Sequence, residues 1–138
     1  MSHARQQIRE QVATLVTGLA TTGSRVHQSR MRPDTLPCLL VTTNDEEIVP
    51  GTVGDLRQRM LDLVITGYAK AGDTLDDTLD TIAAEVEVAI DSGYPKDRAE
   101  LARIEVDFDD SLEKPVGSIA LTYRITYFTE AGAPGVKL

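Results

Sequence analysis

The sequence has little of what disulfide cross-links, metal sites and most catalytic centres require. Its 138 residues include one cysteine, two histidines and no tryptophan. Cys38 lies in the apolar run Cys38-Leu39-Leu40-Val41 and has no intrachain disulfide partner, so we expect a buried thiol in a reducing compartment. His3 and His27 are far apart in the chain, and together with Cys38 they give no zinc-ligand spacing. We therefore expect no metal site and no cofactor.

Long apolar runs and excess positive charge are also absent. No stretch approaches the roughly 20 apolar residues of a membrane span, and residues 1–10 lack the apolar part of a signal peptide. The formal net charge is −8, which disfavours general binding to nucleic acids or anionic membranes. We expect one soluble domain over residues 1–138, with a flexible C-terminal tail at about 129–138, where two glycines and a proline occur.

Motifs for catalysis or ion binding are incomplete. The acidic group Asp107, Asp109, Asp110 and Glu113 lacks the glycine and the terminal spacing of a calcium loop. The segment 51–55 has two glycines but lacks the Gly-Lys-Ser/Thr ending of a phosphate loop. Because no cluster of titratable groups stands out, the sequence favours a binding or structural protein over an enzyme, and we assign no catalytic residue.

Two segments have the apolar spacing of amphipathic helices. The first covers residues 3–20, and Gly18 and Gly23 weaken and then end it. The second follows Gly72, has Asp73 or Thr74 as its cap and is stopped by Gly93 and Pro95. The apolar positions that define the two helices are Ile8, Val12, Leu15, Val16 and Leu19, and Leu75, Leu79, Ile82, Ala83, Val86 and Ile90.

Alternation of apolar and polar residues predicts the strands. The expected strands are a short one at 24–28, one at 38–43, a long central one at 57–68, one at 104–108 and the strongest one at 119–127. Between them we expect an exposed loop at 29–37, a polar turn at 44–47, a loop or short edge strand at 48–54, a polar stretch at 96–103 that is either helical or irregular, and a turn at 109–115.

This order of elements predicts the α+β (mixed α/β) fold class. We expect a two-layer domain, in which two main helices pack on one face of an antiparallel or mixed β-sheet. The other face and the edges of the sheet would then need polar side chains or a neighbouring subunit, because bare edges recruit other chains.

One basic concentration interrupts the acidic chain. It consists of Arg25, His27, Arg30 and Arg32. Such a loop is either a solubilising surface or a docking surface for an acidic partner. We take these four residues as the candidate protein–protein docking site.

The order of the elements resembles the bacteriophage tail terminator family, the lambda-type minor tail protein U. The resemblance covers most of the chain, and its most specific part is the closing strand Leu121-Thr122-Tyr123-Arg124-Ile125-Thr126-Tyr127. The chain departs from the family in its Gly-Pro loop at 48–54 and in the polar tail after Phe128. The other matching parts are the first helix, the strand opened by Leu36-Pro37, the strand 59–68 and the helix 74–91.

The resemblance implies a structural virion protein that forms a homo-oligomeric ring, a hexamer, on the head-proximal end of the tail. There the ring would cap the tail tube, stop its polymerisation and offer a surface to the head–tail connector or neck protein. Such a ring needs two different faces of each subunit in contact. DNA would pass through the lumen without specific binding, and the protein would be assembled in the host cytoplasm.

Two other functions stay open at this point. A neck or tail-completion protein at the head–tail junction would share the size and architecture. A small ligand-binding domain or enzyme with a hidden pocket belongs to a different class.

Overall fold

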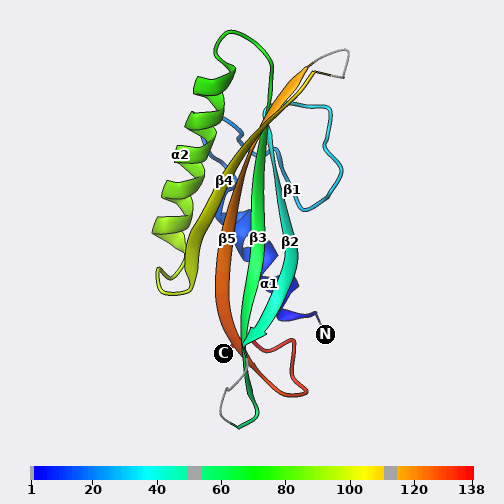
Figure 1. Cartoon of the computed structure of the whole chain (residues 1–138), viewed down its shortest axis with the longest axis vertical. Coiled ribbons are helices and arrows are strands. Elements are labelled where there is room, and N and C mark those ends of the chain that lie inside the picture. The colour runs from blue at the N-terminus through cyan, green and yellow to red at the C-terminus, as the bar shows by residue number, and fades with distance from the viewer. Residues whose placement is uncertain (1, 50–53, 111–114) are drawn as a thin grey trace.

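The fold is described by a computed structural model over residues 2–49, 54–110 and 115–138. Figure 1 shows two helices and a sheet of long strands, which confirms the predicted α+β class. No helix in these ranges is long and apolar enough to cross a membrane. The elements in chain order are α1 (Ala4–Leu15), β1 (Val26–His27), β2 (Cys38–Val49), β3 (Leu56–Lys70), α2 (Leu75–Gly93), β4 (Ala99–Asp109) and β5 (Val116–Glu130).

The five strands form one mixed sheet in the order β1-β2-β3-β5-β4. β1 runs parallel to β2, and every other pair is antiparallel. β3 lies at the centre, as its length and alternation predict. It pairs with β5 without a register shift, from Leu56 opposite Glu130 to Lys70 opposite Val116. This long ladder is the frame on which the other elements are arranged.

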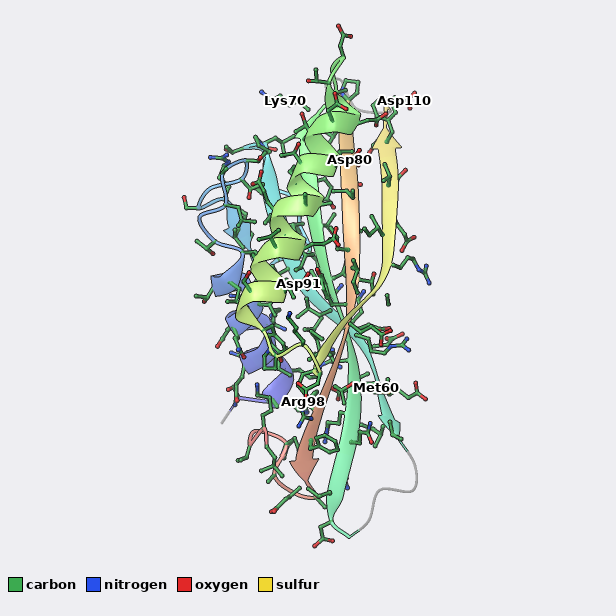
Figure 2. The ribbon with its side chains drawn as sticks, turned by 90° about the vertical axis from the view of Figure 1, so that its left-hand side faces the viewer. Met60, Lys70, Asp80, Asp91, Arg98 and Asp110 are labelled. Atoms are coloured by element: carbon green, nitrogen blue, oxygen red, sulfur yellow. The ribbon has the colours of Figure 1, made fainter. Side chains whose placement is uncertain are left out.

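Both helices pack on the same face of the sheet, as the view in Figure 2 shows. Because side chains alternate between the two faces of a strand, every second residue of β3 and β5 points toward the helices. Burying this row together with the apolar stripes of α1 and α2 gives a single core. Its largest fully buried side chains are Tyr123, Tyr127, Ile8, Leu39, Leu61, Leu63, Ile65, Leu79, Ile82, Ile119, Leu121 and Ile125.

Two sequence predictions about β2 and β4 are wrong. Residues 44–47 form no turn, because β2 continues to Val49 across a register shift between Thr43 and Glu46. Two β2 residues lie opposite one β3 residue there, which is the geometry of a bulge that tolerates polar residues at an edge. Residues 99–103 are the start of β4 rather than part of a helix, and β4 has its own shift between Leu101 and Arg103.

Several element ends also differ from the prediction. α1 ends at Leu15 instead of residue 20, and the chain turns at Gly18, whose φ of 89° is a conformation that glycine adopts most easily. Thr74 is the N-terminal cap residue of α2, although its side chain makes no capping hydrogen bond. A loop or short edge strand is predicted at 48–54; residues 48 and 49 belong to β2, and residues 50–53 lie outside the described ranges. Residues 111–114 of the turn predicted at 109–115 also lie outside these ranges.

The C-terminal segment after β5 folds back beside the start of α1. β5 reaches Glu130, so the segment begins two residues later than predicted. The amide of Ala4 donates to the carbonyl of Pro134 at 2.8 Å, and the amide of Leu138 donates to the carbonyl of Phe128 at 3.0 Å. These bonds tie the segment to two elements, and its flexibility stays a prediction.

Gly67 is the position where the core has no room for a larger residue. A Cβ on Gly67 would lie 2.7 Å from Cγ2 of Ile82 on α2 and 3.4 Å from Cδ2 of Leu39. We predict that Gly67→Ala lowers the free energy of unfolding by about 1–3 kcal/mol, because α2 must move off the sheet. Gly72→Ala is the control, since nothing lies within 4 Å of its Cβ position. Equal urea midpoints for the two variants would contradict this packing.

Candidate functional site

The four residues of the predicted docking site do not form one free basic patch. Arg25 is bound within the fold: its Nε donates to the carbonyl of Pro37 at 2.6 Å, and its Nη2 donates to the carbonyl of Thr21 at 3.1 Å. These bonds join the segment after α1 to the start of β2. Arg25 therefore positions the loop, and its charge is partly enclosed.

Arg30 lies on the outer edge of β2, with its guanidinium against the backbone. Its Nη2 donates to the carbonyl of Thr43 at 2.7 Å, and its Nη1 donates to Oδ1 of Asn44 at 3.1 Å. Arg9 from α1 also reaches Thr43, donating to its hydroxyl at 2.9 Å. Arg9 and Arg30 line one shallow hollow of about 60 Å³ together with Gln28 and residues 41–43. Two guanidinium groups at one hollow make this edge attractive to a carboxylate.

The remaining two residues point elsewhere. His27 is exposed on β1. Arg32 lies over the ring of Tyr68, with 6.0 Å from its Cζ to the ring centre, and Tyr68 belongs to the sheet face that the helices do not cover. The loop thus reaches from the β2 edge onto the open face.

Cys38 at the start of β2 is fully buried and free, as the sequence predicts. Burial raises the pKa of its thiol, and the nearby charges of Arg32 and Arg25 oppose that rise. A thiol in this state is mostly protonated near neutral pH, which makes it a poor nucleophile.

A buried polar cluster lies under the start of α1, on the same sheet face as the core. Arg59 on β3 forms an ion pair with Glu46 on β2 at 3.0 Å, and their side chains are only 8% and 7% exposed. Arg59 Nε also donates to the Thr129 hydroxyl at 2.9 Å, and the Tyr127 hydroxyl donates to the second oxygen of Glu46. Because each charge has a partner within the cluster, the group braces the ends of β2, β3 and β5.

The sequence did not predict this cluster, because residues 44–47, which include Glu46, were expected to form a turn. In the alternation of the predicted strand 57–68, Arg59 falls on the same side as Leu61 and Leu63, and a charged residue at a core-facing position signals a buried partner of opposite charge. The bulge in β2 turns Glu46 toward Arg59, and no local pattern in the sequence predicts a bulge at that residue.

The edge strand β4 carries an exposed apolar strip. Ile104, Val106 and Phe108 are 44%, 61% and 52% exposed, although they lie on the sheet face that holds the core. The reason is the position of α2, which packs against β3 and β5. The alternation of residues 104–108 predicts a strand, but the placement of α2 decides whether its apolar side is covered.

Within the described residues, no group of three or more His, Cys, Asp or Glu side chains is arranged to hold a metal ion. The described residues offer three surfaces as candidates for function: the basic β2 edge with its loop, the apolar strip of β4 and the open face of the sheet.

Comparison with solved structures shows that the fold of this chain also occurs in known proteins. A chain in a structure titled "Virion of native gene transfer agent (GTA) particle" superposes with a TM-score of 0.52 and 20% sequence identity, over 90% of this chain and 90% of that chain. No protein-family model and no curated protein matches the sequence. At this identity the likeness shows a shared fold.

The two buried tyrosines of β5 give a test of how polar groups are satisfied in the core. Tyr127 donates to Glu46, whereas the hydroxyl of Tyr123 is buried with no partner among the described residues. We predict that Tyr127→Phe lowers the free energy of unfolding by about 1.5–3 kcal/mol, because a buried carboxylate loses a donor. Tyr123→Phe should leave it unchanged or raise it, as measured by urea unfolding at pH 7. Equal losses in the two variants would contradict the assignment.

The pH dependence of stability in alkaline solution should also differ between these variants. Burial is the main cause that raises the pKa of both phenols above the usual value of 10.0. A group whose folded pKa is raised contributes stability below its unfolded pKa and loses it as the pH rises. Stability should therefore fall above about pH 10, and this fall should be shallower in Tyr123→Phe than in the parent chain.

Proposed function

We propose that this chain is a structural virion protein with the role of a tail terminator. In this role copies of the chain form a ring on the head-proximal end of the tail tube, stop its growth and present a surface to the head connector. The observation that carries the proposal is the fold shared with a chain of a gene transfer agent virion over nine-tenths of both chains. Likeness over nearly the full length means a common domain architecture, which agrees with the family resemblance of the sequence.

The arrangement of the sheet supports a role in assembly. Its two edges differ: β4 is long and carries an apolar strip, whereas β1 is two residues long and lies beside basic side chains. A closed ring of identical subunits needs contacts between two different surfaces of each copy. A subunit with two unlike edges at opposite sides of one sheet meets this requirement.

The buried polar groups support a structural rather than an enzymatic role. The Glu46–Arg59 pair is nearly inaccessible, and its hydrogen bonds are made to Tyr127 and Thr129 within the chain. A catalytic acid or base must reach its substrate within hydrogen-bond distance. We therefore propose that these residues stabilise the fold and that the chain is not an enzyme.

The experiment is to add the purified chain to tail tubes growing from their own purified subunit and to score tube length and end occupancy by electron microscopy. Shorter tubes with a ring at one end, increasing with protein concentration, are the expected result. Tubes of unchanged length with bare ends would rule out termination. Binding to an isolated head connector in that case would point to a neck or tail-completion role.

A second prediction concerns DNA, which in this proposal passes through the ring. The acidic chain should leave duplex DNA unretarded in a mobility-shift assay at moderate salt, because like charges oppose phosphate contacts. Duplex binding that persists at moderate salt would argue against a lumen through which DNA moves freely.

A further inference from the structure

We infer that copies of this chain meet head to tail, with the β4 edge of one copy against the β1 edge and the 27–32 loop of the next. This inference rests on the proposed function and names the two surfaces that the ring would bring together. Four observations support it: the unpaired backbone edge of β4, the exposed apolar residues beside it, the register that places β1 and β4 on one row across the sheet, and the charges at the two edges.

The β4 edge is open to a partner. β4 has eleven residues and pairs only with β5, so its second backbone edge has no neighbouring strand within the described residues. An exposed strand edge of this length recruits other chains unless it is blocked. Ile104, Val106 and Phe108 add an apolar strip beside that edge, and apolar area at this exposure is a mark of an interaction site.

The opposite edge is built differently. β1 covers only Leu39 and Leu40 of β2, and the β2 carbonyls further along accept hydrogen bonds from arginines: Thr43 from Arg30 and Asn44 from Arg5. These guanidinium groups oppose the addition of a strand at that part of β2. A partner at this edge therefore meets β1, the arginine-lined hollow and the exposed side chains of the loop. Met31, at 81% exposure, is the apolar one among them.

The two edges lie at the same level of the sheet. The register places Val26 of β1 opposite Leu39, Leu39 opposite Gly67, Gly67 opposite Ile119, and Ile119 opposite Val106 of β4. Val26 and Val106 are thus the two ends of one row across all five strands. A neighbour placed edge to edge continues this row, and a fixed rotation between neighbours can close a ring.

The charges at the two edges favour a second copy of this chain as the partner, in the head-to-tail orientation. The β4 side is mostly acidic and the β1 side is mostly basic, so unlike edges attract and two β4 edges repel each other. The hollow between Arg9 and Arg30 is suited to a carboxylate from β4. Arg103 of β4 pairs with Glu105 at 3.4 Å, and Arg32 lines one hollow of the open face with Asp107 and Asp109 of the same chain, so these charges are partly balanced within the subunit. The other acidic residues of β4 and of the start of α2 are Glu100, Asp73, Asp76, Asp77 and Asp80; the basic side chains at the opposite edge are Arg5, Arg9, His27 and Arg30.

The test uses the fact that the only cysteine is buried. Cysteines are introduced at two exposed positions, giving Met31→Cys, Val106→Cys and the double variant, and each purified chain is treated with a flexible bis-maleimide. The reaction is run at high protein concentration, alone and with tail tubes present. Head-to-tail contact predicts that the double variant shifts from monomer to a ladder of dimers and higher species. Each single variant should stay monomeric.

The matched control is Leu56→Cys combined with Val106→Cys. Leu56 is 40% exposed but lies at the far end of β3, eleven residues from Gly67, which is on the row of Val106, or roughly 36 Å along the strand. This pair should give no ladder. A dimer from Val106→Cys alone would mean a symmetric β4–β4 contact and would overturn the inference, and so would a double variant that stays monomeric under both conditions.

The two proposals can fail separately. A ladder from the double variant, together with tubes that keep growing when the parent chain is added, would keep the head-to-tail contact and reject tail termination. Capped tubes without cross-linking would keep the proposed function and reject these two edges as the contact.

Discussion

The uninterrupted antiparallel pairing of β3 with β5 is the constraint on which the rest of the structure depends. Fifteen residues of each strand alternate in phase, so the middle of one face of the sheet receives a row of apolar side chains from both strands, Leu61, Leu63 and Ile65 from β3 and Ile119, Leu121, Tyr123, Ile125 and Tyr127 from β5. A slip by one residue would turn this row to the opposite face. The close approach of Ile82 to Gly67 then fixes how deeply α2 seats on that row, and α1 completes the same core beside it.

The one-sided core also explains where the surfaces lie. Two helices cover β2, β3 and β5, and the apolar side of β4 remains exposed although it lies on the core face. Toward the opposite edge of the sheet, Arg5 of α1 and Arg30 of the loop donate hydrogen bonds to backbone carbonyls of β2. The molecule therefore has one edge open to strand addition and one edge blocked by arginines, and the proposed ring would bring these two unlike edges together.

Local patterns predicted most of the fold. The spacing of residues such as Ile82 and Val86 predicted α2, and the alternation around Leu63 and Tyr123 predicted β3 and β5 with the correct buried sides. The predictions were wrong for segments whose secondary structure is decided by contacts with distant parts of the chain. Residues 44–47 and 99–103 form strands because of the ladders beside them, together with bulges that no local pattern specifies.

The candidate site was harder to predict for the same reason. The sequence shows that Arg25, His27, Arg30 and Arg32 are close together in the chain, but their partners come from distant segments. Pro37, Thr43 and Tyr68 decide that Arg25 and Arg30 bind backbone and that Arg32 reaches the open face. The exposure of the apolar strip of β4 could not be predicted from the sequence, because it depends on the position of α2, and that position depends on the packing of the whole core.

The most direct measurement is a cryo-electron microscopy reconstruction of tail-tube ends saturated with this chain. We expect a closed ring in which β4 of each subunit lies against β1 and the 27–32 loop of its neighbour, with the row through Gly67 continuing from copy to copy. A ring with β4 exposed to solvent would contradict the proposed contact, and tube ends without any ring would contradict the proposed role as a capping subunit.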